Sequence, residues 1–150
     1  MTSAGKSKCN EAFLGDLYKN IKMGSDSIIT LMPKVKGDAL RQEMTAELNR
    51  YEELAKKIGD LIYDEGETPK EENILTKFSA KMGMTFSTMI DDTDSHIAQM
   101  MIEGATMGVT ECTKLLREYE NKDCSQKALS LAKQSIKFME DTVERMKNYL

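Results

Sequence analysis

The chain has 150 residues, of which 40% are hydrophobic and 31% charged, and a formal net charge of −4. This length fits one domain around one core, and the low count of two prolines favours helices over a β-sandwich or a disordered tail. The acidic balance excludes a dedicated binder of nucleic acid or of anionic membranes, because such partners attract a clustered excess of Lys and Arg.

Neither the cysteines nor the first residues indicate export. Cys9, Cys112 and Cys124 are odd in number and lack CxxC spacing, so the sequence predicts neither a disulfide framework nor a zinc knuckle. No apolar run approaches the roughly 18 residues of a membrane span, and the opening MTSAGKSK lacks the apolar core of a signal peptide. We therefore expect a cytoplasmic protein with no membrane contact.

The first half of the chain predicts a pair of helices. Residues 1–9 are small, polar and basic, and we expect a disordered lead-in there. Apolar residues at spacings of three and four predict helices over 10–32 and 38–64. Asp38 is the expected N-cap of the second helix and Gly66 its expected stop. Because the loop between them is short, the two helices should form an antiparallel hairpin.

A third helical segment is predicted over 69–90. Thr68 and Glu71 flank a proline at the first helical position, and the acid can bond back to the capping residue. The short polar side chains at 91–95 then favour a break, because they compete for backbone donors. The segment is either a crossover that returns the chain along the bundle or the first half of a kinked helix that continues over 94–119.

Two more helices are predicted, over 94–119 and 124–149. The apolar stripe of the first contains Gly104 and Gly108, which would let a neighbouring helix or another subunit approach closely. The second is preceded by residues spaced like a capping box that begins at Asp123. No segment has the sustained alternation of a strand, so the sequence predicts an all-α fold.

Two helix hairpins joined by a longer connection are the layout of the ferritin-like fold. We therefore expect a single domain over 10–150, an antiparallel four-helix bundle with an additional crossover helix, five helical segments in all. The di-iron centre of that fold needs Glu-x-x-His on each of two helices. Because His96 is the one histidine in the chain, the sequence excludes the full set.

A simpler metal site is the alternative. Glu47, Glu103 and Glu140 each fall beside an apolar stripe and could hold a divalent cation such as manganese, magnesium or iron. His96 lies just inside a predicted helix start, where the helix dipole favours the neutral imidazole that can bind metal. The competing interpretation is that the acids flank the stripes and pair with Lys or Arg, and that the histidine is a surface or capping residue.

Methionine is used twelve times, and six copies fall between Met82 and Met107. Thioethers are ligands that Cu(I) prefers. Most of these methionines lie on predicted core stripes, however, which favours the filling of core gaps.

Two stretches, DSHIAQMMIEGATMGVTECTKLLREY at 94–119 and KFMEDTVERMKNYL at 137–150, resemble uncharacterised ferritin-like bundle proteins of Gram-positive anaerobes, a domain family of unknown function. The resemblance spans about residues 10–150. It implies a ferritin-like bundle with no established reaction, and it supplies no functional residues.

The sequence contains no P-loop, GxGxxG, GxSxG, HExxH or EF-hand motif, and no nucleophile stands at a useful spacing from His96. We therefore predict no catalytic or cofactor-binding residue and no particular small-molecule substrate. The favoured hypothesis is a non-catalytic interaction or scaffold protein that self-associates, most simply as a homodimer. The alternative is a carboxylate-rich metal-binding or oxidase-like bundle that uses Glu47, His96, Glu103 and Glu140.

Overall fold

The computed structural model describes residues 2–69 and 93–150, with the side chains described from residue 9 onward in the first range. Within these ranges the chain is helical, which confirms the all-α prediction. The helices are α1 (Thr2–Leu31), α2 (Asp38–Asp64), α4 (Asp94–Tyr119) and α5 (Gln126–Met146), with short 3-10 turns η1 (Met32–Lys34) and η2 (Lys147–Tyr149). The predicted helix over 69–90 lies outside the described residues from residue 70 onward.

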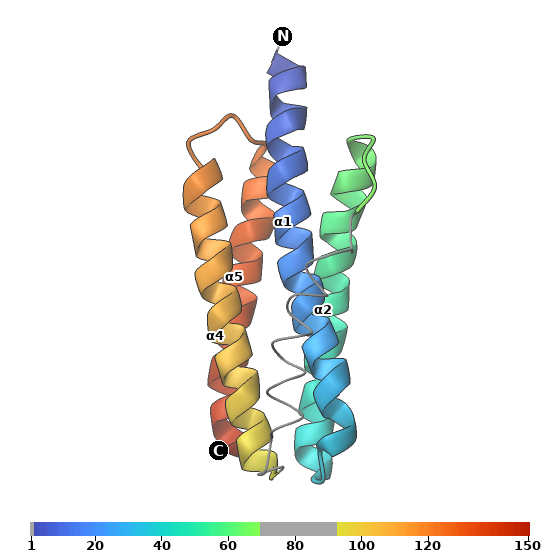
Figure 1. Cartoon of the computed structure of the whole chain (residues 1–150), viewed down its shortest axis with the longest axis vertical. Coiled ribbons are helices and arrows are strands. Elements are labelled where there is room, and N and C mark those ends of the chain that lie inside the picture. Colours follow the sequence, from blue (N-terminus) through green and yellow to red (C-terminus); the bar gives the residue numbers. More distant parts are fainter. Residues whose placement is uncertain (1, 70–92) are drawn as a thin grey trace.

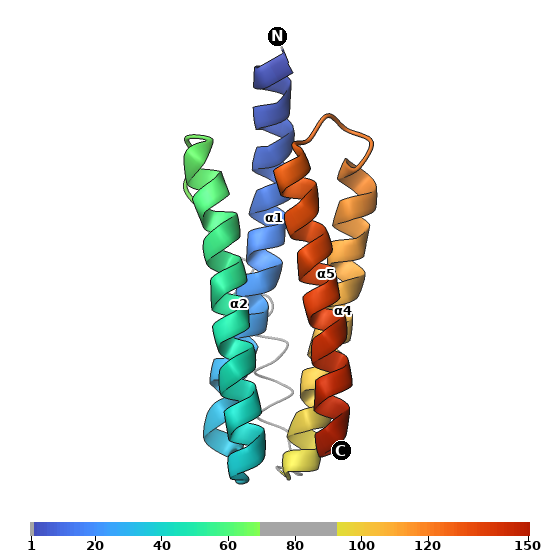
Figure 2. The same ribbon diagram turned by 180° about the vertical axis from the view of Figure 1, so that it is seen from behind.

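The helices lie side by side in an elongated bundle (Figures 1 and 2). Helices α1 and α5 run in one direction, and α2 and α4 run in the other (Figure 1). The most extensive packing joins α4 with α5, α1 with α2, and α1 with α4, all antiparallel pairs. The end of α2 and the start of α4 lie at opposite ends of the bundle (Figure 1).

The interior is a continuous apolar core to which all four helices contribute. Burying the apolar side chains of this core favours folding by roughly 25 cal/mol per Å² of apolar surface removed from water. The largest fully buried side chains are Phe13, Leu14, Leu17, Ile21, Ile28, Leu31, Leu40, Met44, Ile58, Ile97, Met139 and Met146. None of the described helices has an apolar stretch long enough to cross a membrane.

The predicted start of the first helix at residue 10 was wrong. Helix α1 begins at Thr2, and its first turns project beyond the other helices (Figure 1). Extending an existing helix adds one hydrogen bond for each residue fixed, so polar residues continue a helix that a packed stripe has nucleated. Cys9 is also bonded to Cys124, which anchors this part of α1 to the bundle.

Two helix ends follow the sequence prediction closely. Helix α4 has the predicted bounds, and the hydroxyl of its N-cap Thr93 accepts a hydrogen bond from the backbone N–H of His96. Helix α2 ends at Asp64, and two residues later Gly66 has a left-handed φ of 83°. Around this glycine, Gly66 N–H donates to the carbonyl of Tyr63 and Glu67 N–H to that of Ile62. This pair of bonds is a Schellman motif.

Two predicted caps were wrong. The N-cap of α5 is Ser125, whose hydroxyl accepts from the N–H of Ala128, and it replaces the capping box expected from Asp123. The N-cap of α2 is Gly37, and Asp38 is already helical. Gly37 gives the helix no side-chain cap, and its own N–H donates to the carboxylate of Asp94 on α4.

Candidate functional site

The most polar feature of the interior is the carboxylate of Glu47, which is 0% exposed on α2. Its Oε1 accepts hydrogen bonds from Nε of Arg145 and, at 3.1 Å, from Nη1 of Arg50. Its Oε2 accepts from Oγ1 of Thr142 at 2.7 Å. Both oxygens are therefore satisfied, which a buried carboxylate needs to offset the loss of its hydration.

The partners come from two helices at helical spacing. Thr142 and Arg145 lie three residues apart on α5, so both reach the same point on α2. The hydrogen bond to Glu47 raises the pKa of Arg145, although partial desolvation opposes this. The Nη2 atom of Arg145 is buried and has no hydrogen-bond partner in the described part of the chain. This cluster is a hydrogen-bonded, charge-paired link between α2 and α5.

Two potentially reactive side chains in the interior are held in their neutral forms. Burial, followed by the charge of Glu47, raises the pKa of Tyr51, whose ring meets that of Phe138 edge to face at 4.6 Å. Burial, followed by the charge of Glu111, raises the pKa of Cys112 to about 12. At neutral pH the first is a phenol and the second a thiol, and thiols are poor nucleophiles.

The other two predicted carboxylate ligands lie on the surface. Glu103 is exposed on α4 and accepts a hydrogen bond from Nε2 of Gln99 at 3.1 Å. Glu140 is exposed on α5. Neither points into the interior where Glu47 lies, so the structure does not bring the three carboxylates together.

His96 is half-buried in the first turn of α4, where its backbone N–H binds the Thr93 cap as expected from its position. Among residues 2–69 and 93–150, no three His, Cys, Asp or Glu side chains converge as a metal site would require. The four predicted ligands therefore occupy separate places. For Glu47 the structure agrees with the competing interpretation, in which the acid pairs with arginine. The pairing takes place inside the bundle and not at the edge of an apolar stripe.

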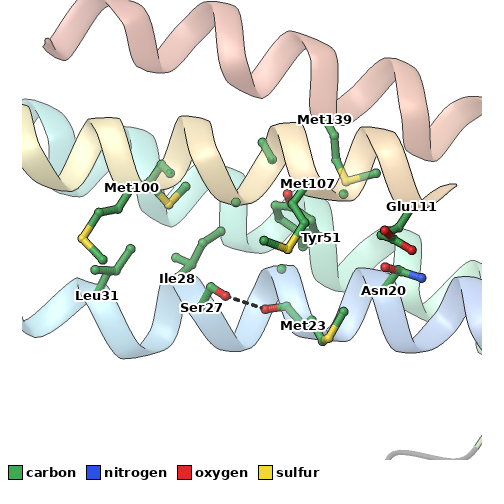
Figure 3. A pocket seen from close by; sticks show the side chains of 15 residues that line it. Asn20, Met23, Ser27, Ile28, Leu31, Tyr51, Met100, Met107, Glu111 and Met139 are labelled. Atoms are coloured by element: carbon green, nitrogen blue, oxygen red, sulfur yellow. Dashed lines mark hydrogen bonds between the residues drawn. The ribbon is translucent and has the colours of Figure 1, made fainter. Parts of the chain in front are cut away.

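A second candidate is a cavity of about 50 Å³ between α1 and α4, with contributions from α2 and α5 (Figure 3). We call it the α1–α4 groove. Its lining is Asn20, Met23, Gly24, Ser27, Ile28, Leu31, Tyr51, Met100, Met101, Gly104, Ala105, Met107, Gly108, Glu111 and Met139. In Figure 3 the side chain of Met107 points from α4 toward α1. Met107 is also 47% exposed, so the groove reaches the surface at this methionine.

The glycines of the groove have different roles. A Cβ on Gly24 would overlap the ring of Tyr51, and one on Gly108 would overlap Sδ of Met139. A Cβ on Gly104 would meet no atom of residues 2–69 and 93–150 within 4 Å. The close helix approach predicted at Gly104 and Gly108 is therefore confirmed at Gly108, where Met139 of α5 packs against the glycine. At Gly104 the described residues leave space open.

The prediction that the chain has no disulfide was wrong, because Cys9 and Cys124 are bonded, with their Cα atoms 5.4 Å apart. The bond joins α1 to the loop before α5 across 115 positions of sequence. No spacing rule could reveal it, since the two residues meet only when both hairpins pack at one end of the bundle. Cys112 is a free, buried thiol.

No family model matches the chain, and the searches of curated proteins and of solved structures found no match. The resemblance to a ferritin-like family of unknown function stays a prediction.

Proposed function

We propose that this protein is a non-catalytic helical bundle that acts by association, with a second copy of the chain as its partner. The observation that supports this is the α1–α4 groove, an apolar surface depression with an exposed methionine at its mouth. Methionine side chains adapt to irregular partners, and exposed apolar surface is typical of interaction sites.

A two-fold contact suits this groove. The groove lies between the neighbouring helices α1 and α4. Two copies that pack groove to groove would be related by a two-fold axis, because each would present the same surface to the other. Met107 of each copy would then lie near the open space at Gly104 of the other. Gly104 is the groove glycine whose small size the packing within the chain does not require.

The helix directions support a ferritin-like bundle as the fold. Two antiparallel hairpins, α1–α2 and α4–α5, are joined so that α2 and α4 are parallel, and one long crossover is the connection found in ferritin-like folds. The connection over 65–93 has 29 residues against the 27 of α2, so it is long enough to return along the bundle even at a helical rise of about 1.5 Å per residue.

The interior supports a non-catalytic role. Glu47 is paired with two arginines and accepts a hydrogen bond from a threonine, and Cys112 is held as a thiol. The metal-binding alternative would need several ligands to converge, and the described residues offer no set of three. It predicts stoichiometric metal in protein purified without chelator, which elemental analysis would measure.

Light scattering of two groove variants tests association. Met107→Glu places a charge on the apolar surface, and Gly104→Gln fills the open space; both positions tolerate the change in the folded chain because one is exposed and the other unobstructed. The matched control is Gln134→Glu, which adds the same charge at an exposed position of α5. We expect both groove variants to be monomeric and the control to associate like the wild type. Equal association of all four proteins would contradict the proposal.

A further inference from the structure

The disulfide stands beside a second, non-covalent link between the same two segments. Asn10 follows Cys9 in α1, and Ser125 follows Cys124 before α5. The backbone N–H of Ser125 donates to Oδ1 of Asn10 at 3.0 Å, and Nδ2 of Asn10 donates to Oγ of Ser125 at 3.1 Å. Residues 9 and 124 are thus joined covalently, and the next pair along is joined by two hydrogen bonds.

Asn10 also connects this end of the bundle to α2. Its side chain is 2% exposed, and Nδ2 donates to Oε1 of Glu65, the C-cap residue of α2. Ser125 in turn caps α5 through the N–H of Ala128. These contacts use none of the sulfur atoms, so they can persist when the disulfide is open.

We propose that Cys9 and Cys124 form a reversible thiol–disulfide pair whose oxidation equilibrium is set by the hydrogen bonds between Asn10 and Ser125. With the disulfide reduced, these bonds keep the two thiols adjacent. Holding two reacting groups together raises their effective concentration and favours closure of the bond. Asn10 and Ser125 are therefore positioning residues for the redox pair.

The oxidant is a small disulfide such as glutathione disulfide. One cysteine, as thiolate, attacks it to form a mixed disulfide and releases one glutathione thiolate. The second cysteine thiolate then attacks the protein sulfur of the mixed disulfide, which forms the Cys9–Cys124 bond and releases the second glutathione. The two protein thiols lose two electrons and two protons, and the glutathione disulfide gains both.

The third cysteine does not interfere with this pair. Cys112 is 0% exposed within the bundle, and burial raises the pKa of its thiol to about 12. Exchange proceeds through thiolates, so this residue does not compete as a nucleophile at neutral pH.

The test measures the equilibrium constant for thiol–disulfide exchange between the Cys9–Cys124 pair and glutathione, here called the exchange constant. The folded, full-length protein is equilibrated in buffers with varied ratios of reduced to oxidised glutathione, and its free thiols are then counted by alkylation and mass spectrometry. We expect Asn10→Ala to lower the constant about tenfold, because it removes the buried hydrogen bonds that hold the two cysteine-bearing segments together. The matched control is Asn49→Ala, the same change at an exposed position of α2 outside the groove. The control should stay within about twofold of the wild type.

A conservative variant separates positioning from general stability. Ser125→Thr keeps the hydroxyl and the N–H, so its exchange constant should match the wild type. If Asn10→Ala loses its helical circular dichroism, Asn10→Asp is measured in its place. The aspartate keeps the acceptor for the N–H of Ser125 and loses the donor to its hydroxyl. Its exchange constant should also be lower than that of the wild type. The proposal would be overturned if the Asn10→Ala variant and the Asn49→Ala control had the same exchange constant. A wild-type bond that stays closed at every glutathione ratio would overturn it as well.

Discussion

Glu47 and Arg145, 98 residues apart in the chain, form an ion pair inside the bundle, with the carboxylate 0% exposed. The pair links the second helix to the last. Such a pair contributes little beyond a well-packed apolar alternative, but removing one partner leaves a buried charge without compensation.

Arg145→Met should therefore destabilise the fold by about 3 kcal/mol, because Glu47 stays buried with only Arg50 and Thr142 as partners. The measurement is the free energy of unfolding in urea. Arg117→Met, a change of the same type at an exposed position of α4, is the control and should cost under about 0.5 kcal/mol. Equal costs for the two variants would show that the ion pair does not stabilise the interior.

Stability should fall above pH 9 because of Cys112. The folded-state pKa is about 12 and the ordinary value is 9.0, so between these values the unfolded chain loses a proton that the folded chain keeps. The contribution is complete below pH 9 and decreases as the pH rises to 12, by at most about 1.4 kcal/mol per pH unit. Urea unfolding at pH 8, 9 and 10 should give a flatter profile for Cys112→Ala. Parallel profiles would rule out this thiol as the cause.

Asp94 ties the start of α4 to the turn before α2. Its carboxylate accepts from the N–H groups of Lys36 at 2.9 Å and Gly37 at 2.7 Å. Asp94→Ala should lower the free energy of unfolding by about 1–2 kcal/mol, since it removes two charge-assisted hydrogen bonds and a first-turn acid. Asp60→Ala, which loses one exposed ion pair with Lys56, is the control and should change little. An Asp94→Ala variant with the same free energy of unfolding as the wild type would contradict the role assigned to this carboxylate.

The two glycines of α4 should respond in opposite directions to alanine. Gly104→Ala has free space and gains helix propensity, so it should stabilise by about 0.5–1 kcal/mol. Gly108→Ala would press on Sδ of Met139, which is 1% exposed, and overpacking should destabilise by about 1–3 kcal/mol. Thermal unfolding of both variants measures the difference. Shifts of the same sign would contradict the assignment.

Local signals predicted the helices well. The bounds of α4 were predicted correctly, because Thr93 and the acids after it carry the start signal in adjacent residues. The stop at Gly66 was equally local, since only the left-handed backbone of that residue closes the Schellman motif. The cap predicted at Asp123 was wrong because Ser125, two residues later, caps α5, and the cap predicted at Asp38 was wrong because α2 begins there after an uncapped Gly37.

Contacts between helices were not predictable in the same way. The sequence placed Glu47 beside its apolar stripe, as a metal ligand or as an acid paired with Lys or Arg, and its full burial was not predicted. Arg145 and Thr142 become partners only once α5 packs on α2, which no spacing along the chain reveals. The disulfide between Cys9 and Cys124 was missed for the same reason.

Sedimentation equilibrium of the wild-type chain over a range of concentrations tests the central claim most directly. Association through the α1–α4 groove predicts a mass that rises from 16.9 kDa toward twice that value, and Met107→Glu should remain at 16.9 kDa throughout. A wild-type chain that stays at the single-chain mass at every concentration would contradict the proposed function.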